Sequence, residues 1–218
     1  MRSRQEIKAL AKDAMKRQHG TSVLIAVSIL VFSAIMSALS FLFVFAPLLN
    51  VIISFATSFM LAVWGVNVYG AFIKIYQHEE TSVQEVAANM KVNFLRKLGG
   101  TYWVMLWVML WSLLLVIPGI IKGLAYYFTP NILADSPNVT AREAIKLSMR
   151  ITDGHKGKIF VFILSWIGWY MLSALTFGIL WVFYVGPYWF ASDAGLYLEL
   201  RDNAIKEGRV TKEEFGLE

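Results

Sequence analysis

The sequence contains no cysteine and few charged residues. Without thiols the chain can form neither disulfides nor thiolate metal sites, so cysteine usage does not indicate its redox compartment. Charged residues make up 16% of its 218 residues, whereas soluble chains usually carry about a quarter. Hydrophobic residues account for 57%, with eight Trp and fifteen Phe. This composition predicts a multi-spanning membrane protein rather than a soluble protein with a large core.

The sequence also lacks the motifs of common enzyme classes. It has no phosphate-binding loop, dinucleotide fingerprint or nucleophile elbow, and too few buried carboxylates for a paired acid–base site. His19, His78 and His155 all lie near predicted span ends. Three histidines on one side could meet around a metal, but no ligand spacing such as His-x-x-x-His supports this, and we favour boundary histidines. We therefore expect no enzyme activity, no cofactor and no metal site.

Six apolar runs follow one another, and each is a candidate membrane span. Turn signals at Pro47, Pro118-Gly119 and Thr176-Phe177-Gly178 separate the two members of each pair. The first run is too long for the apolar core of a signal peptide, which predicts a retained span. The fourth run is short and is interrupted by Pro130, and Gly186-Pro187 breaks the sixth. The runs cover residues 21–45, 48–75, 102–117, 120–134, 159–175 and 179–200.

The basic residues are confined to alternate loops. All Lys and Arg except Lys122 lie near the N-terminus, in residues 74–97, in residues 135–158 or near the C-terminus. Because basic loops stay in the cytoplasm, we expect a multi-pass protein with cytoplasmic N- and C-termini. Topology already accounts for these charges, so we expect no nucleic-acid partner.

A capping pattern occurs three times at one spacing from a glycine. Ser3-x-x-Glu6, Ser82-x-x-Glu85 and Thr140-x-x-Glu143 precede Gly20, Gly99 and Gly157, each seventeen residues after the Ser or Thr. The pattern predicts amphipathic helices over residues 3–19, over 82–98, and from 140 to a stop within 153–157, each leading into a hairpin.

These observations predict the fold class. We expect an all-α membrane protein with six transmembrane helices, arranged as three parallel repeats of an amphipathic interfacial helix plus a transmembrane hairpin. The chain would form a single domain with repeat units at about 3–78, 82–135 and 140–200 and a short cytoplasmic tail at 201–218. The alternative to duplication is that any cytoplasmic helix before a span needs a cap and a stop, and Thr211-x-x-Glu214 also matches the cap pattern.

The first amphipathic helix carries a basic stripe. Arg4, Lys8, Lys12 and Lys16 recur every four residues, opposite an apolar face that includes Ile7. Such a helix can lie on anionic lipid headgroups. The helix can equally keep its basic face in water and pack its apolar side on the membrane domain, and one helix can do both.

A second group of residues predicts a ligand site within the spans. Pro130-Asn131, with Asp135 five residues after the proline, corresponds loosely to Pro187-Tyr188, with Asp193 six residues after it. Proline frees backbone carbonyls and a nearby carboxylate can hold a cation, and broken helices at matching positions often mark a transporter site. Asn67 lies at depth in the second span. The alternatives are ordinary proline kinks, pairing of Asp193 with a cation of the third amphipathic helix, a loop position for Asp135, and interhelical hydrogen bonding by Asn67.

One set of residues forms a recognisable signature: Pro130-Asn131-Ile132-Leu133-Ala134-Asp135, Ala144-Ile145-Lys146-Leu147-Ser148, Asp153-Gly154, Phe160, Ile167-Gly168-Trp169, Pro187-Tyr188 and Tyr197. With these residues the sequence resembles a bacterial integral membrane protein family catalogued as domain of unknown function 975. This likeness spans nearly the whole chain, including the basic start. A looser likeness is to the membrane domain of some glycerophosphodiester phosphodiesterases, whose catalytic domain has no counterpart here. The resemblance to the domain of unknown function 975 implies a multi-pass protein of the bacterial cytoplasmic membrane, and it implies no reaction.

Two functional classes follow from these features. The first is non-enzymatic binding or transport of a lipid-like or small hydrophobic molecule, with membrane lipids as partners. The alternative is a structural or regulatory membrane protein whose basic cytoplasmic helices recruit a partner or sense anionic lipid. A homo-oligomer or another membrane partner would fit either class.

Overall fold

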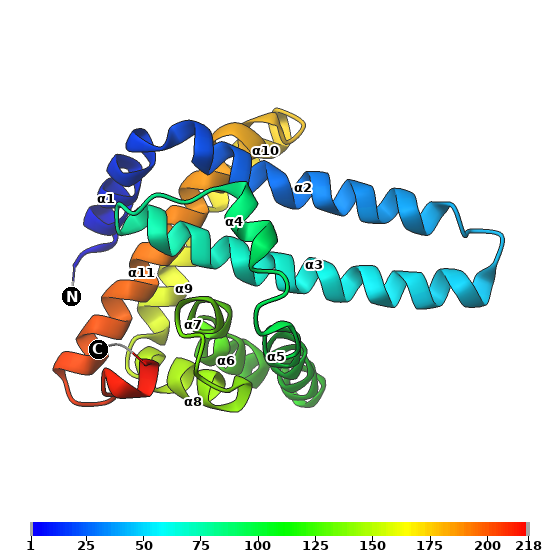
Figure 1. Ribbon diagram of the computed structural model, residues 1–218. Helices are drawn as coiled ribbons and strands as arrows, with labels where there is room; N and C mark the ends of the chain where they lie inside the picture. The colour runs from blue at the N-terminus through cyan, green and yellow to red at the C-terminus, as the bar shows by residue number, and fades with distance from the viewer. Residues whose placement is uncertain (1, 217–218) are drawn as a thin grey trace.

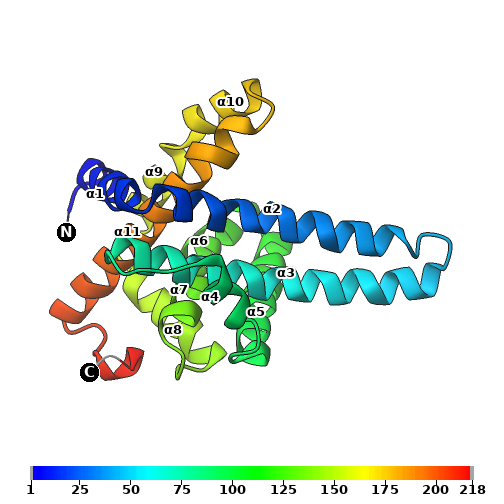
Figure 2. The ribbon, with the colours of Figure 1, turned by 45° about the horizontal axis from the view of Figure 1, so that its top comes forward.

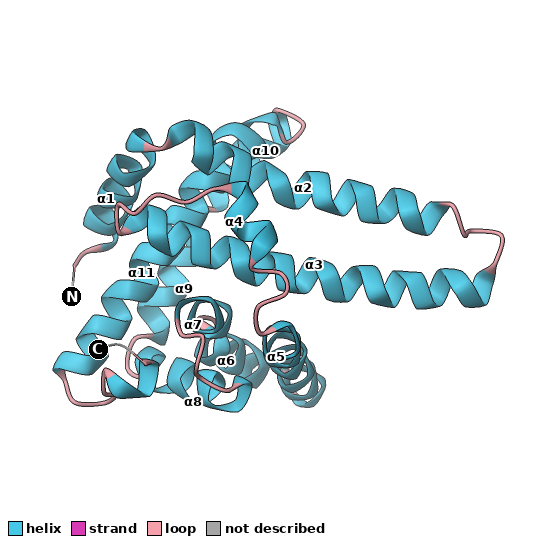
Figure 3. Ribbon diagram, in the orientation of Figure 1, coloured by secondary structure: helices cyan, strands magenta, loops and turns pink. Residues whose placement is uncertain are grey.

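In the computed structural model, which describes residues 2–216, every regular element is a helix (Figure 1, Figure 3). The all-α prediction is therefore confirmed over these residues, and the last two positions of the predicted tail lie outside them. In chain order the elements are α1 (Arg4–Arg17), α2 (His19–Phe41), α3 (Pro47–Tyr76), α4 (Val83–Ala88), α5 (Phe94–Leu114), α6 (Val116–Tyr126), α7 (Thr129–Asp135), α8 (Ala141–Thr152), α9 (Lys156–Leu164), α10 (Ile167–Leu175), the π-helix η1 (Trp181–Val185), α11 (Gly186–Lys206) and the 3₁₀ helix η2 (Glu213–Phe215).

Three helical segments are long and apolar enough to cross a membrane. They are α2, α3 and the stretch Lys156–Leu175, which comprises α9 and α10. Only 17% of the most apolar window of α2 is buried inside the molecule, so most of its apolar surface needs another apolar environment. This supports a membrane protein, and the six-span count stays a prediction.

The helices form three hairpins that point in different directions. α2 and α3 run side by side and project far beyond the rest of the molecule in both views (Figure 1, Figure 2). The chain reverses between α5 and α6 at Leu115, whose backbone is extended (φ −160°, ψ 142°). The third hairpin joins α10 to η1 through Phe177 and Gly178, both with positive φ. In Figure 1 α5 is seen nearly end-on, whereas α2 and α3 lie in the plane of the picture.

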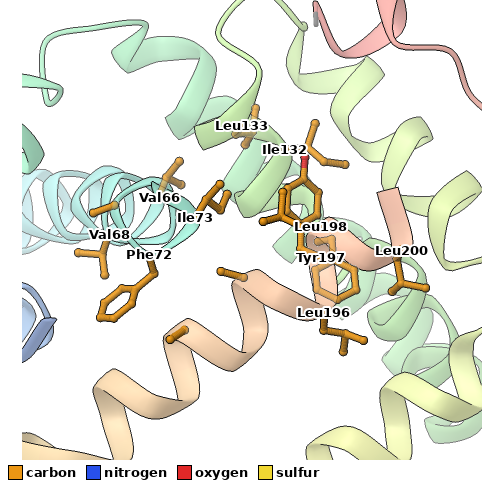
Figure 4. Close-up of a cluster of buried hydrophobic side chains, with 14 of the residues drawn as sticks. Val66, Val68, Phe72, Ile73, Ile132, Leu133, Leu196, Tyr197, Leu198 and Leu200 are labelled. Atoms are coloured by element: carbon orange, nitrogen blue, oxygen red, sulfur yellow. The ribbon is translucent and has the colours of Figure 1, made fainter. Parts of the chain in front are cut away.

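The core lies where the inner half of α3 packs on α7 and α11. Phe72, Leu133 and Tyr197 are fully buried in it. α1 covers a neighbouring part of this core with Ile7, Ala11, Ala14 and Met15. Figure 4 labels ten of the core side chains, which come from three helices: Val66, Val68, Phe72, Ile73, Ile132, Leu133, Leu196, Tyr197, Leu198 and Leu200.

All three predicted N-caps are present. The side chains of Ser3 and Thr140 accept hydrogen bonds from the third residue of their helices, and Glu6 and Glu143 complete the capping boxes. Ser82 caps α4 in the same way, but Glu85 turns instead toward Lys74. The caps therefore support three equivalent helix starts, without deciding between duplication and independent capping.

The predicted stop of the third amphipathic helix within residues 153–157 is confirmed, since α8 ends at Thr152 and Asp153 is its C-cap, but the repeated glycines themselves do not end helices. Gly20, Gly99 and Gly157 all lie inside the helix that follows, and the predicted helix over 82–98 is only α4, followed by a turn in which Asn93 is left-handed (φ 52°). Gly100 has a packing role, because a Cβ there would lie 2.5 Å from Leu133 Cδ1. Gly100 thus lets α5 approach α7 rather than ending a helix.

The predicted turn at Pro118-Gly119 is also wrong. Both residues lie in the first part of α6, where the backbone N–H that proline lacks would have no intrahelical acceptor. Gly119 allows α6 to pack closely on α5, since a Cβ would come 2.9 Å from Ser112 Cα. Pro47 likewise starts α3 rather than standing in the turn.

The short or broken spans take irregular forms. The fourth run divides into α6 and α7, and the fifth into α9 and α10 with a break at Ser165 and Trp166. The expected break at Gly186-Pro187 corresponds to η1, which runs directly into α11. Asp135 is the last residue of α7 and not a loop residue.

Candidate functional site

A polar pocket of about 520 Å³ lies where the inner end of α3 meets α4, α5 and α7. It is bounded by backbone and side chains of α3, α4, the 77–81 and 89–93 segments, the start of α5, the end of α7 and Arg201 of α11. We call it the α3–α5 pocket. Its charged lining residues are Lys74, Glu79, Glu85, Arg96, Lys97, Asp135 and Arg201.

Lys97 is the most buried cation of the α3–α5 pocket. Its side chain comes from the first turn of α5, and the residue is 6% exposed. The ammonium donates to Asn67 Oδ1 at 2.6 Å and to the carbonyl of Asn89 at 2.9 Å. Asn67 in turn donates to the carbonyl of Val86 at 3.1 Å. One lysine and one amide thus tie α5 to α3 and α4.

Arg96, the neighbour of Lys97, reaches α7 and the loop after it. Its guanidinium donates to the carbonyls of Leu133, Ser136 and Val139 at 2.5–2.8 Å. These carbonyls lie at and beyond the C-terminal end of α7, where a cation is favourable. The Nε–H of Arg96 is buried and has no acceptor among the described residues.

The other cations of the pocket are neutralised. Lys74 bonds to Glu85 at 2.5 Å, and this contact lowers the pKa of the Glu85 carboxyl. Arg201 pairs with Asp135 at 2.7 Å in a nearly buried contact, and the Tyr197 hydroxyl donates to the same carboxylate oxygen at 2.8 Å. Burial, reinforced by the charge of neighbouring Arg96, lowers the pKa of Lys97 to about 8. Among residues 2–216, Arg96 and Lys97 are therefore the lining cations without a carboxylate partner, and Glu79 is the lining carboxylate without an ion pair.

A second site lies between α1 and α9. A groove of about 600 Å³, here called the α1–α9 crevice, is lined by Ile7, Val161, Phe162 and Leu196 together with the basic and polar start of the chain. Its cations are Arg2, Arg4 and Lys158, of which Arg2 pairs with Glu199 at 3.7 Å. The crevice therefore combines an apolar floor with basic groups at its edge.

The predicted basic stripe borders this crevice. Lys8 donates to Ser165 Oγ at 2.8 Å and lies 4.0 Å from the Trp166 ring centroid, and burial lowers its pKa to about 8. Lys12 and Lys16 are exposed and line a smaller hollow of about 260 Å³ with Tyr188. The apolar face of α1 is buried on the protein, as the second interpretation of this helix predicted.

The six predicted ligand residues are not gathered at one site. Asn131 and Asp193 meet, with Asn131 Nδ2 donating to Asp193 Oδ2 at 3.1 Å in the core, and the carboxylate has no ion pair within residues 2–216. Asp193 thus does not pair with a cation of α8. Pro130 and Pro187 lie in the first turns of α7 and α11. Asn67 lines the α3–α5 pocket and Tyr188 the hollow beside Lys16.

Sequence reasoning missed Arg96 and Lys97. They read as topology-setting charges before a span, which is the ordinary role of basic residues there. The one available signal was Asn67, an amide at depth that needs a partner, but its partner Lys97 is thirty residues away in sequence.

Residues 100–204 match a known family model. The family is described as "Protein of unknown function (DUF975)". The match confirms the predicted resemblance from within α5 to near the end of α11, and leaves α1 to α4 outside it. No curated protein and no solved structure matches the chain.

Both pockets lie at the border of the DUF975 segment. In the α3–α5 pocket, Asn67, Arg96 and Lys97 precede the segment, whereas Leu133 and Arg201 belong to it. In the α1–α9 crevice, Ile7 precedes it and Phe162 belongs to it. The first 99 residues therefore complete both sites.

Proposed function

We propose that the protein is a non-enzymatic, multi-pass membrane protein that binds an anionic lipid in the α1–α9 crevice. The observation that carries this proposal is the pairing of an apolar floor with three cations at the edge of one groove. Acyl chains match the floor through the hydrophobic effect, and a phosphate headgroup matches the cations.

The position of the crevice supports a lipid rather than a soluble ligand. α9 begins one of the three candidate spans, and Phe160, Val161 and Leu164 are exposed along it. A lipid in the surrounding bilayer would enter laterally along this face. Lys158 stands at the start of the span, where basic side chains meet headgroups.

The proposed membrane arrangement has six segments in three hairpins, each preceded by a cytoplasmic helix. The uncharged hairpin ends support it, since Phe45 and Phe177 are almost fully exposed at the ends of their hairpins. The basic loops support cytoplasmic termini in a bacterial cytoplasmic membrane. The three repeats and their common orientation belong to the same proposal.

Lipid retention tests the crevice. The full chain in phosphatidylcholine nanodiscs is offered phosphatidylglycerol, and bound lipid is counted by native mass spectrometry. Val161→Trp fills the groove and Arg4→Gln removes a cation at its edge, so each should reduce retained phosphatidylglycerol several-fold. Leu175→Trp, on an exposed part of α10, and Lys212→Gln, on the exposed tail, are the matched controls.

Two results would overturn this function. One is a wild-type protein that retains phosphatidylglycerol no better than phosphatidylcholine. The other is retention that the crevice variants and their controls change equally.

The regulatory alternative has one observation in its favour. Arg4, Lys12 and Lys16 remain exposed after α1 has packed. If these residues sense anionic lipid without holding a molecule, Lys12→Gln with Lys16→Gln should weaken the preference for anionic nanodiscs while leaving retained lipid unchanged.

A further inference from the structure

We propose that the α3–α5 pocket binds a phosphate-bearing anion, with Lys97 and Arg96 as its direct ligands. This is a different site from the α1–α9 crevice, with different cations and a different wall. Its ligand can fail to bind while the crevice retains lipid, and the reverse also holds.

The charge balance of the α3–α5 pocket favours a bound anion. Lys74 and Arg201 each have a carboxylate partner. Arg96 and Lys97 are consecutive in sequence and, within residues 2–216, contact uncharged acceptors only. Two like charges placed together at low exposure are unfavourable unless an anion compensates them. An anion between them removes both the repulsion and part of the desolvation penalty.

Unused hydrogen-bond donors of Lys97 and Arg96 also favour a bound anion. An ammonium has three N–H groups and a guanidinium five. Lys97 uses two of its three, and Arg96 uses three of its five. Buried donors are ordinarily satisfied, so the bare Nε of Arg96 marks a group not fully paired within the chain. A tetrahedral phosphate offers several acceptor oxygens to such a pair.

The size and walls of the pocket define the ligand further. Small-molecule sites usually measure about 300–1,000 Å³, and this pocket of about 520 Å³ holds more than an inorganic ion. Ala71, Val86 and Leu133 supply apolar wall beside the cations. A phosphate monoester with a small organic group fits this lining. It can come from the cytoplasm as a free compound or from a phospholipid headgroup.

The ionisation of Lys97 gives a test that needs no substitution. With its pKa lowered to about 8, the free protein loses this charge as pH rises through 8, whereas the phosphate is already a dianion above about pH 7. Affinity should therefore fall between pH 7 and 9. The charged groups that face Lys97 from the surrounding elements are Lys74, Glu79, Glu85, Arg96, Asp135 and Arg201.

The binding experiment uses the full chain in phosphate-free detergent and then in phosphatidylcholine nanodiscs. The probes are inorganic phosphate, glycerol 3-phosphate and acetate, measured by calorimetry and by the tryptophan-fluorescence unfolding temperature. Glycerol 3-phosphate should bind saturably, and Lys97→Gln should weaken it about tenfold or more, as expected for loss of a charge-assisted hydrogen bond. Lys97→Arg should restore part of the affinity.

Two controls address charge and fold. Lys91→Gln removes a cation from an exposed position outside the pocket lining and should leave binding unchanged. Glu79→Gln removes a competing negative charge from the lining and should strengthen binding. If Lys97→Gln fails to fold, the pH profile of the wild type and the Glu79→Gln variant still decide the question.

The outcomes separate clearly. Absence of saturable binding by either phosphate compound, together with no competition by phosphatidic acid in nanodiscs, overturns the site. So do equal binding of acetate and affinity that is flat from pH 7 to 9. Competition by phosphatidic acid without binding of glycerol 3-phosphate identifies a lipid headgroup as the source of the phosphate. Binding that survives Arg4→Gln confirms that the pocket is independent of the crevice.

Discussion

The two halves of α3 have similar apolar sequences and opposite surroundings. In the outer half Leu48 is 84% exposed and Phe55 is 61% exposed, whereas in the inner half Val63 and Phe72 are completely buried. In the inner half Asn67 and Lys74 bond to α4, whereas in the outer half Asn50 bonds to the end of α2 and Thr57 to its own helix. One helix thus serves as protein core at one end and as a surface that needs lipid at the other.

This difference teaches that hydrophobicity does not say what covers a helix. A window of apolar residues is equally compatible with burial in protein and exposure to hydrocarbon. The distinguishing feature is where the polar side chains find their partners. Asn67 in the inner half bonds to Val86 of α4 and Lys97 of α5, whereas Thr57 in the outer half bonds within its own helix.

The largest expected effect comes from breaking the buried ion pair beside the inner half. Asp135→Ala leaves Arg201 paired only with the exposed Asp202 and removes the acceptor of the Tyr197 hydroxyl, so unfolding free energy should fall by about 3 kcal/mol. Asp13→Ala, in an exposed pair with Arg17, should change it by less than about 1 kcal/mol. Chemical unfolding in detergent, followed by tryptophan fluorescence, measures both. Equal effects would mean that the Asp135 pair is not structural.

A pair of phenylalanines tests the comparison within one helix. Phe72→Ala empties a core position and should cost about 3–5 kcal/mol. Phe55→Ala, in the exposed outer half, should cost little in detergent micelles. The same unfolding assay reports both, and a comparable loss for Phe55→Ala would show that the outer half packs against something other than detergent.

A charge in the outer half tests whether lipid covers it. Phe55→Lys should disfavour membrane insertion by about 3 kcal/mol, measured by glycosylation-site or translocon insertion assays. Leu95→Lys, at an exposed position at the start of α5, lies before the predicted third span and should insert normally. Normal insertion of both variants would contradict a hydrocarbon setting for the outer half.

The smallest effect concerns the caps. Thr140→Ala removes the α8 capping box and should cost about 1 kcal/mol, and Thr140→Ser should restore most of it. The matched change Thr57→Ala, on an exposed hydroxyl within the outer half of α3, should be neutral. A melting temperature that is unchanged by Thr140→Ala would mean that α8 is held by packing alone.

The sequence predicted helices where local chemistry is strong. The second span, expected over residues 48–75, is α3 within one residue at each end, because an uninterrupted apolar run and an initial proline fix it. The hairpin at Phe177 and Gly178 followed from the glycine. The caps at Ser3 and Thr140 followed from the Ser/Thr-x-x-Glu spacing, which encodes a reciprocal hydrogen bond.

The failures have a common physical origin. Glycine was read as a signal for chain reversal, yet Gly100 and Gly119 are needed for close approach of helices, which depends on residues distant in sequence. The actual breaks, at Leu115 and Asn93, carry no strong local signal. The same limit applies to the site, because Lys97 and Arg96 are defined by partners on α3, α4 and α7.

The adjacency of Arg96 and Lys97 has a mechanical consequence for α5. Successive residues of an α-helix project about 100° apart, and these two bond to different neighbours. Arg96 donates to the end of α7, whereas Lys97 donates to Asn67 of α3 and to Asn89 at the end of α4. The first turn of α5 is therefore pinned from two directions. Rotation of α5 about its own axis must therefore release its contacts with α3 and α7 in the same step.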